Sequence, residues 1–317
     1  MSGHTATNLD VVTVGEAMVL FAAQQAGPLD KVGSFTRTTA GAELNVAIGL
    51  ARLGFRVGYL SRVGDDSFGR YLCASLDHEG IDRSQLVMTA DLPTGFMLKS
   101  RSDDGSDPAT EYFRRGSAAS HMSAADIPRG YCAASRHLHL TGIFVAVSAS
   151  ARELVFDMAA DARTFGRSVS FDPNLRPALW HSQAEMIECL NRLAAASDWV
   201  FPGLEEGRLL TGCHSPQEIA SFYLDHGAAA VVVKLGPSGA YFASALESGF
   251  IPGIAVERIV DTVGAGDGFA VGTISGLLED LPLAEAAARG NAIGARVIQF
   301  PGDCDGLPTR EELNTTR

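Results

Sequence analysis

The stretch DTVGAGDGF, residues 261–269, leads directly into a helical pattern of small residues, AVGTISGLL at 270–278. Three glycines within five positions let the backbone approach a ligand closely. The N–H groups at the start of a helix point outward and favour a bound anion. We therefore expect Gly264, Ala265 and Gly266 to form an anion hole made of backbone amides.

Asp267 follows these residues in the first turn of the expected helix. A carboxylate at this point is poorly placed to bind an anion itself. It is well placed to accept the proton of a hydroxyl that attacks a phosphoryl group. Asp267 is thus the candidate catalytic base. The motif alone leaves an alternative open, a glycine-rich helix start in which Asp267 is only an N-cap.

Short runs rich in β-branched residues alternate with helical patterns along the chain. The runs lie at 11–15, 57–61, 137–144, 168–174, 198–203 and 229–236, and the helical patterns lie at 43–53, 151–165, 183–196 and 266–278. Such alternation predicts an α/β fold, with a mostly parallel sheet covered by helices. Ligands bind such sheets beyond the carboxyl ends of the strands.

Two segments, 18–40 and 93–117, break this alternation. In the second, TGFMLKSR and TEYFRRG flank a turn-rich stretch and read as a hairpin, which needs further strands to be stable. We predict that both segments form a small β-sheet lid over the site of one α/β domain that spans 1–310. A short tail, 311–317, is expected to fray together with the residues after about 308.

Composition limits the partners and the compartment. The formal net charge is −12, which argues against general binding to nucleic acid or to an anionic membrane. The five cysteines are scattered and include no C-x-x-C pair, so reduced thiols are expected. The N-terminus lacks the pattern of a signal peptide, and no apolar run is long enough to span a bilayer. We therefore expect a cytoplasmic protein.

A second glycine turn, KLGPSG, runs from Lys234 to Gly239 and follows a very apolar strand pattern. At a carboxyl strand end, this turn is suited to nucleotide phosphates or ribose, although it also reads as a plain β-turn. The common nucleotide fingerprints are missing. There is no G-x-x-x-x-G-K-[ST], and the first strand ends in Gly15-Glu16-Ala17 rather than G-x-G-x-x-G.

The stretches TAGAELNVA at 39–47 and DTVGAGD at 261–267 resemble the two signatures of ribokinase-like (PfkB-type) sugar kinases. GEAM at 15–18, YFRRGSAA at 112–119 and DPNLRPALW at 172–180 are similar to the branch of that family that acts on 2-keto-3-deoxygluconate, as is Gly302-Asp303. The resemblance runs from about residue 11 to about 310. It implies a three-layer α/β/α sandwich with a β lid, and phosphoryl transfer from ATP with Mg²⁺ to a sugar hydroxyl.

The resemblance also implies roles for single residues. It places six residues at the substrate, namely Gly41, Asn45, Tyr112, Arg114, Arg176 and Asp303. It places five at the nucleotide, namely Asn174, Lys234, Gly236, Gly239 and Asn291, and one, Glu206, near Mg²⁺ through water. Arginine suits an acidic sugar because its planar fork donates two parallel hydrogen bonds to a carboxylate.

Three positions depart from the family's pattern: Ala40 replaces a glycine, Met97 a tyrosine, and Gly203 an asparagine near the metal. Each assigned residue also has an ordinary structural reading, such as a solvated arginine or a helix cap. Two other functions stay open: a kinase for fructose, ribose or 2-keto-3-deoxygalactonate, and a sugar-binding sensor without turnover. Exposed strand edges on the lid make a homodimer an expectation too.

Overall fold

The computed structural model describes residues 9–101, 108–128 and 130–315. Within them, a central sheet has the strand order β13-β12-β11-β10-β9-β8-β1-β4-β5. Its strands are β1 (Leu9–Val14), β4 (Val57–Gly64), β5 (Leu86–Thr89), β8 (Ser135–Thr141), β9 (Ser168–Asp172), β10 (Trp199–Val200), β11 (Ala230–Lys234), β12 (Gly239–Ser244) and β13 (Ser248–Pro252). Neighbours from β5 to β11 are parallel, whereas β11, β12 and β13 are antiparallel. The predicted mostly parallel sheet is confirmed.

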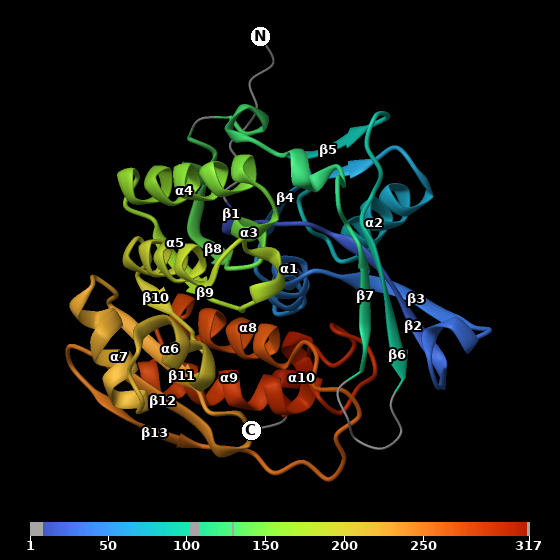
Figure 1. Ribbon diagram of the computed structural model, residues 1–317. Coiled ribbons are helices and arrows are strands. Elements are labelled where there is room, and N and C mark those ends of the chain that lie inside the picture. The colour runs from blue at the N-terminus through green and yellow to red at the C-terminus, as the bar shows by residue number, and fades with distance from the viewer. Residues whose placement is uncertain (1–8, 102–107, 129, 316–317) are drawn as a thin grey trace.

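Helices cover both faces of this sheet, which confirms the predicted three layers (Figure 1). One face carries α1 (Ala42–Arg52), α2 (Ser67–His78), α8 (Ala265–Leu278), α9 (Leu283–Val297) and α10 (Arg310–Thr315). The other carries α3 (Phe144–Val147), α4 (Ala149–Thr164), α5 (Gln183–Ala195), α6 (Leu204–Thr211) and α7 (Pro216–Asp225). Short 3-10 turns lie at Leu29–Lys31, Ala119–His121, Ala124–Asp126, Tyr131–Ala134, Pro177–Leu179 and Gly236–Ser238.

The strand pattern explains why the core divides into two layers. Successive side chains of a strand point to opposite faces of a sheet. On β11, Val231 and Val233 pack toward α4 to α7, while Val232 between them packs toward α8 and α9. Burial of such aliphatic side chains on both faces stabilises the fold by about 1.5–3 kcal/mol for each residue.

A separate four-stranded sheet stands beside the layered body (Figure 1). Its strands are β2 (Met18–Ala26), β3 (Phe35–Ala40), β6 (Phe96–Arg101) and β7 (Thr110–Phe113), in the order β3-β2-β6-β7. All four lie within the two segments predicted to form the small sheet, 18–40 and 93–117. The turn predicted between β6 and β7 falls mostly outside the described residues. One face of this sheet, with Met18, Leu20 and Met97, is buried.

The carboxyl-terminal end differs from the prediction. Residues 310–315 form α10 rather than a frayed tail. Leu313 is 8 % exposed in the core, and Arg310 Nε donates to the carbonyl of Leu53 at 2.8 Å. These contacts hold a segment whose own sequence gives little helical signal. None of the helices in the described ranges is both long and apolar enough for a membrane span.

Candidate active site

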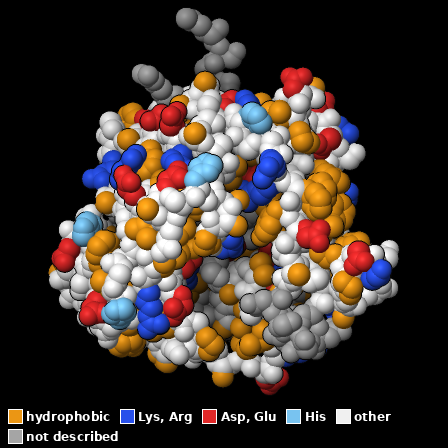
Figure 2. Space-filling view, in the orientation of Figure 1, with side chains coloured by type: hydrophobic (Ala, Val, Ile, Leu, Met, Phe, Trp, Pro, Cys, Tyr) orange, Lys and Arg blue, Asp and Glu red, His pale blue; other side chains and the backbone are white. Residues whose placement is uncertain are grey.

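A cleft of about 1300 Å³ lies between the small sheet and the carboxyl ends of the central strands. Figure 2 shows it as a hollow in the molecular surface. Met97 and Tyr112 line it from the small sheet, Gly41 and Asn45 from the start of α1, and Asp267 from the start of α8. The cleft therefore lies at the sheet edge where ligands were expected.

The glycine-rich motif forms the start of α8, as predicted. Gly264 is the N-cap, with a left-handed φ of 84°. A Cβ at this position would lie 2.3 Å from the carbonyl oxygen of Asp303, so only glycine allows this approach. Gly264 and Gly266 line the cleft, whereas the Ala265 amide donates to the Thr262 carbonyl at 3.4 Å. The first amides of the helix therefore lie at the wall of the cleft.

Asp267 lies in the first turn of α8 and is 8 % exposed. Its carboxylate accepts hydrogen bonds from Asn45 Nδ2 at 2.7 Å and from Asn174 Nδ2 at 3.3 Å. Burial raises the pKa of Asp267 to about 7; the nearby charges of Asp172 and Asp303 add to this, and the Asn45 hydrogen bond opposes it. A carboxylate with such a pKa can take up a proton near neutral pH.

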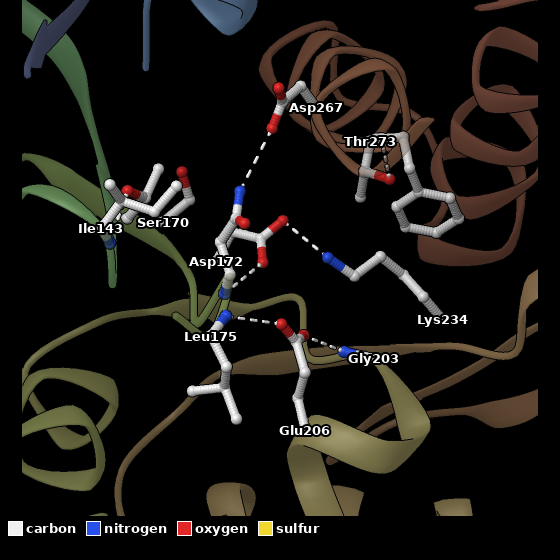
Figure 3. A network of polar contacts seen from close by, with 12 residues as sticks. Ile143, Ser170, Asp172, Leu175, Gly203, Glu206, Lys234, Asp267 and Thr273 are labelled. Carbon is white, nitrogen blue, oxygen red and sulfur yellow. Dashed lines mark hydrogen bonds and ion pairs between the residues drawn. The ribbon is translucent and has the colours of Figure 1, made fainter. Parts of the chain in front are cut away.

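Asp172, at the end of β9, pairs with Lys234, at the end of β11. Figure 3 shows Asp172 at the centre of a polar network, with Lys234 pointing toward it. Lys234 Nζ lies 2.6 Å from Asp172 Oδ2. Burial raises the pKa of Asp172 to about 6, although Lys234 opposes the shift. The Cβ position of Gly266 lies only 3.6 Å from Lys234 Nζ, so a cation and backbone amides share one corner of the cleft.

Glu206, in the first turn of α6, faces the same network (Figure 3). Its carboxylate accepts the Leu175 amide at 2.8 Å and the Gly203 amide at 2.7 Å. In the described part of the chain, no group of three or more acidic, histidine or cysteine side chains could hold a metal ion. Mg²⁺ in phosphoryl-transfer sites is commonly held by one or two carboxylates together with substrate phosphates and water, and Glu206 is a carboxylate that lines this cleft.

The other end of the cleft is built around Arg114. Its side chain is 11 % exposed and pairs with Glu16, which also accepts a short hydrogen bond from Ser117 Oγ. Several buried polar atoms of cleft-lining residues make no hydrogen bond to the described residues, among them Arg114 Nε and Asn45 Oδ1. One is a donor and the other an acceptor. Buried polar atoms of this kind are costly unless a ligand or water pairs with them.

The remaining predicted substrate residues line the cleft but differ in their exposure and in their hydrogen bonds. Tyr112 is 49 % exposed on β7. Arg176 is exposed and donates to the Leu175 carbonyl at 2.8 Å. Asp303 is 4 % exposed, and its Oδ1 accepts from Lys99 Nζ at 2.9 Å.

Three residues predicted to contact the nucleotide do not line the described cleft: Gly236, Gly239 and Asn291. Gly236 and Gly239 form the turn between β11 and β12. Asn291, on α9, donates to the carbonyl of Pro252 at the end of β13 at 3.2 Å. The structure thus places these residues around β12 and β13, near Lys234 but beyond the cleft itself.

Several residues at or beside the cleft were not singled out from the sequence. The sequence patterns include Asp172 in the motif DPNLRPALW and Lys99 in the strand TGFMLKSR, but they predict no role for either side chain. Glu43 lines the cleft although it is 1 % exposed, and burial raises its pKa. One feature of the sequence could have indicated a role for Lys99: it is a lysine at a position of an alternating strand where the pattern predicts a buried side chain. The side-chain partners of these charges are far away in sequence: Lys234 lies 62 positions from Asp172, Thr141 lies 98 from Glu43, and Asp303 lies 204 from Lys99.

Comparisons with known proteins agree with this arrangement. The model of the pfkB family of carbohydrate kinases matches residues 8–310. The chain is 51 % identical to 2-dehydro-3-deoxygluconokinase from Bacillus subtilis, over 96 % of this chain and 94 % of that one. A crystal structure of a PfkB protein from Polaromonas sp. JS666 superposes with a TM-score of 0.90 at 52 % identity, covering 96 % of this chain and 99 % of that one.

A crystal structure from E. coli, described as a ribokinase II in complex with ATP and Mg²⁺, has a TM-score of 0.89 at 26 % identity. It covers 97 % of this chain and 98 % of that chain. The family match extends over both sheets and over every residue that shapes the cleft. The chain belongs to the pfkB family of carbohydrate kinases.

Proposed function

We propose that this kinase transfers the γ-phosphoryl group of Mg·ATP to the terminal hydroxyl of 2-keto-3-deoxygluconate, also called 2-dehydro-3-deoxygluconate, and releases the 6-phosphate and ADP. The observation that carries the proposal is the buried Asp267, held by two amide side chains at the start of α8 and facing the cleft. The similarity to the Bacillus subtilis 2-dehydro-3-deoxygluconokinase supports the choice of sugar.

Asp267 acts as the general base in this reaction. Its carboxylate accepts the proton of the sugar hydroxyl, whose oxygen forms a bond to the γ-phosphorus as the bond to the β,γ-bridging oxygen breaks. The amides at Gly264 to Gly266 and the ammonium of Lys234 stabilise the charge on the transferred group. Asn45 and Asn174 hold the carboxylate in place for this step.

The arginines support an acidic substrate. Arg114 lines the cleft and its Nε makes no hydrogen bond to the described residues, while the exposed guanidinium of Arg176 lies at the edge of the cleft. A sugar carboxylate would satisfy these donors, while a sugar hydroxyl would satisfy the unpartnered Asn45 Oδ1. Tyr112, Gly41 and Asp303 complete the sugar end of the site.

ATP binds with its phosphates at Lys234 and the start of α8, near Asn174. The nucleoside end extends past the cleft toward the turn of Gly236 and Gly239 and toward Asn291. Glu206, which lines the cleft, would hold the Mg²⁺ of Mg·ATP through water, and the ion would supply positive charge beside the phosphates. The proposed reaction needs ATP as a substrate, and all five cysteines are free thiols. Both points support a cytoplasmic setting.

The function is tested by ADP release from Mg·ATP with four sugars: 2-keto-3-deoxygluconate, 2-keto-3-deoxygalactonate, fructose and ribose. We expect fast turnover with keto acids only. Asp267→Asn keeps the size of the side chain but removes the base, so kcat should fall by about 10²–10⁴-fold. Asp65→Asn, at an exposed carboxylate paired with Arg70, is the matched control and should keep wild-type activity.

Each other outcome identifies a different error. Turnover with fructose or ribose alone would keep the base and overturn the acidic substrate. Full activity in Asp267→Asn would overturn the base. Sugar binding measured by calorimetry without ADP release from any sugar would point to a sensor.

We also propose a homodimer formed through the small sheet. Among the described residues, no further strand pairs with the outer edges of β3 and β7, and Phe113 on β7 is 46 % exposed. Exposed apolar side chains beside free strand edges are typical of a surface that pairs with a second copy.

A further inference from the structure

Lys99 joins three parts of the chain that are far apart in sequence. It lies on β6 of the small sheet, and its side chain is 3 % exposed. Its Nζ donates to Asp303 Oδ1 at 2.9 Å and forms a second, very short ion pair with Asp261. Both carboxylates are themselves buried, with 5 % and 8 % of their side chains exposed. A strand of the small sheet is therefore bound to two loops of the layered body.

Both loops shape the start of α8. Asp261 Oδ1 accepts the amide of Val263 at 3.0 Å, which fixes the turn before the glycine motif. The carbonyl oxygen of Asp303 lies against Gly264, where a Cβ would be only 2.3 Å away. The position of the Lys99 ammonium therefore sets the position of the two segments that support the Gly264 to Gly266 amides.

The ammonium also controls the charge of this region. Without it, Asp261 and Asp303 would be two buried carboxylates with no cation between them, an arrangement that repels strongly in a medium of low polarity. Burial alone lowers the pKa of Lys99, but Asp303 and Asp261 together hold it above its ordinary value. Lys99 therefore stays charged at neutral pH.

We propose that Lys99 is a positioning residue for phosphoryl transfer. It holds the amides at the start of α8 at a fixed position relative to the Asp267 carboxylate, and it holds the small sheet against the segments that carry these amides. Lys99 is not at the wall of the cleft, so it acts through Asp261 and Asp303 rather than on the substrate. The role concerns the phosphoryl-transfer chemistry of the family and is independent of which sugar is accepted.

The test compares Lys99→Met, Lys99→Arg and Lys31→Met in steady-state kinetics, with whichever sugar the wild type phosphorylates. Lys31 lies between β2 and β3, and its ion pair is exposed, which makes it the matched control. Lys99→Met should lower kcat by about 10²-fold, the effect of a displacement near 1 Å, and leave KM for ATP nearly unchanged. Lys99→Arg should recover part of the loss because it keeps the charge, and Lys31→Met should match the wild type.

A second variant separates this role from a folding defect. Lys99→Met with Asp261→Asn leaves only one buried carboxylate unpaired, while the asparagine still offers an acceptor to the Val263 amide. We expect this double variant to fold, as judged by near-ultraviolet circular dichroism, and to keep the low kcat. Wild-type kcat in either folded variant overturns the proposal.

Hydrogen exchange gives a readout that needs no turnover. The amides of Val263 and Gly268 bond to Asp261 and to the Gly264 carbonyl, at 3.0 and 2.8 Å. Both should exchange faster in Lys99→Met than in Lys31→Met. Unchanged exchange rates in Lys99→Met overturn the proposal for Lys99, whether or not the wild type phosphorylates a tested sugar. Absence of turnover with every tested sugar would overturn only the proposed substrate.

Discussion

At the scale of single residues, the pKa of Asp267 determines how activity depends on pH. The base works only when it is unprotonated, and burial sets its pKa at about 7. We therefore expect kcat/KM to fall about tenfold per pH unit below about 7 and to level off above it. Asp172→Asn removes a negative charge that raises this pKa and also releases Lys234, so the midpoint should move to lower pH.

The measurement is a pH–rate profile from pH 5 to pH 9, with Asp65→Asn as the control. A lower rate in Asp172→Asn would not by itself support the argument, because only the midpoint reports the pKa of Asp267. An unchanged midpoint, or one at higher pH, would show that Asp172 does not act on Asp267.

At the scale of elements, α8 and α9 pack so closely that small residues are required between them. A Cβ on Gly272 would lie 2.6 Å from the Arg289 carbonyl oxygen and 2.6 Å from Gly290 Cα. We expect Gly272→Ala to lower the free energy of unfolding by about 1–3 kcal/mol, because overpacking outweighs the better helix propensity of alanine. Gly33→Ala is the control, since no atom lies within 4 Å of its Cβ position.

Urea unfolding of both variants checks this prediction. An unfolding free energy of Gly272→Ala equal to that of the wild type would show that α9 can move away from α8 at little cost. A loss of the same size in Gly33→Ala would point to backbone effects rather than to packing.

At the scale of the whole molecule, the exposed face of the small sheet should control assembly. We expect the wild type to sediment at twice the monomer mass, and Phe113→Ser to shift the protein toward the monomer. Leu246→Ser is the control, because Leu246 is 96 % exposed on the loop between β12 and β13, outside the small sheet. A wild type of monomer mass at micromolar concentration, or dissociation of the control as well, would contradict assembly through the small sheet.

The sequence predicted the central sheet, the two segments of the small sheet and the helix start at Asp267, because each depends on local patterns. Three strands of the central sheet, β5, β12 and β13, were missed, since each is short and lacks a long β-branched run. The helix α10 was missed because Leu313 is its one buried residue and tertiary contacts hold it.

The ion pairs of the site could not be predicted for a related reason. Lys99 and Asp303 are 204 positions apart, and Lys234 and Asp172 are 62 apart. No local pattern records which charges meet across such distances, because the folded backbone brings them together. Motifs could place Asp267 on a helix start but could not show that Arg114 is already paired with Glu16.

The cleft lies between two walls that come mostly from different thirds of the chain. Most of the sugar end is built from residues between Glu16 and Arg114, with Arg176 and Asp303 added from later in the chain, whereas most of the phosphate end is built from residues between Asp172 and Asp267. Mutations in the amino-terminal third can therefore alter the sugar that is accepted while the phosphoryl-transfer apparatus is inherited intact. Directed evolution toward new sugars should accordingly randomise cleft-lining positions within the first 120 or so residues, together with Arg176 and Asp303, and keep Asn45, Lys99, Asp172, Lys234 and Asp267 constant.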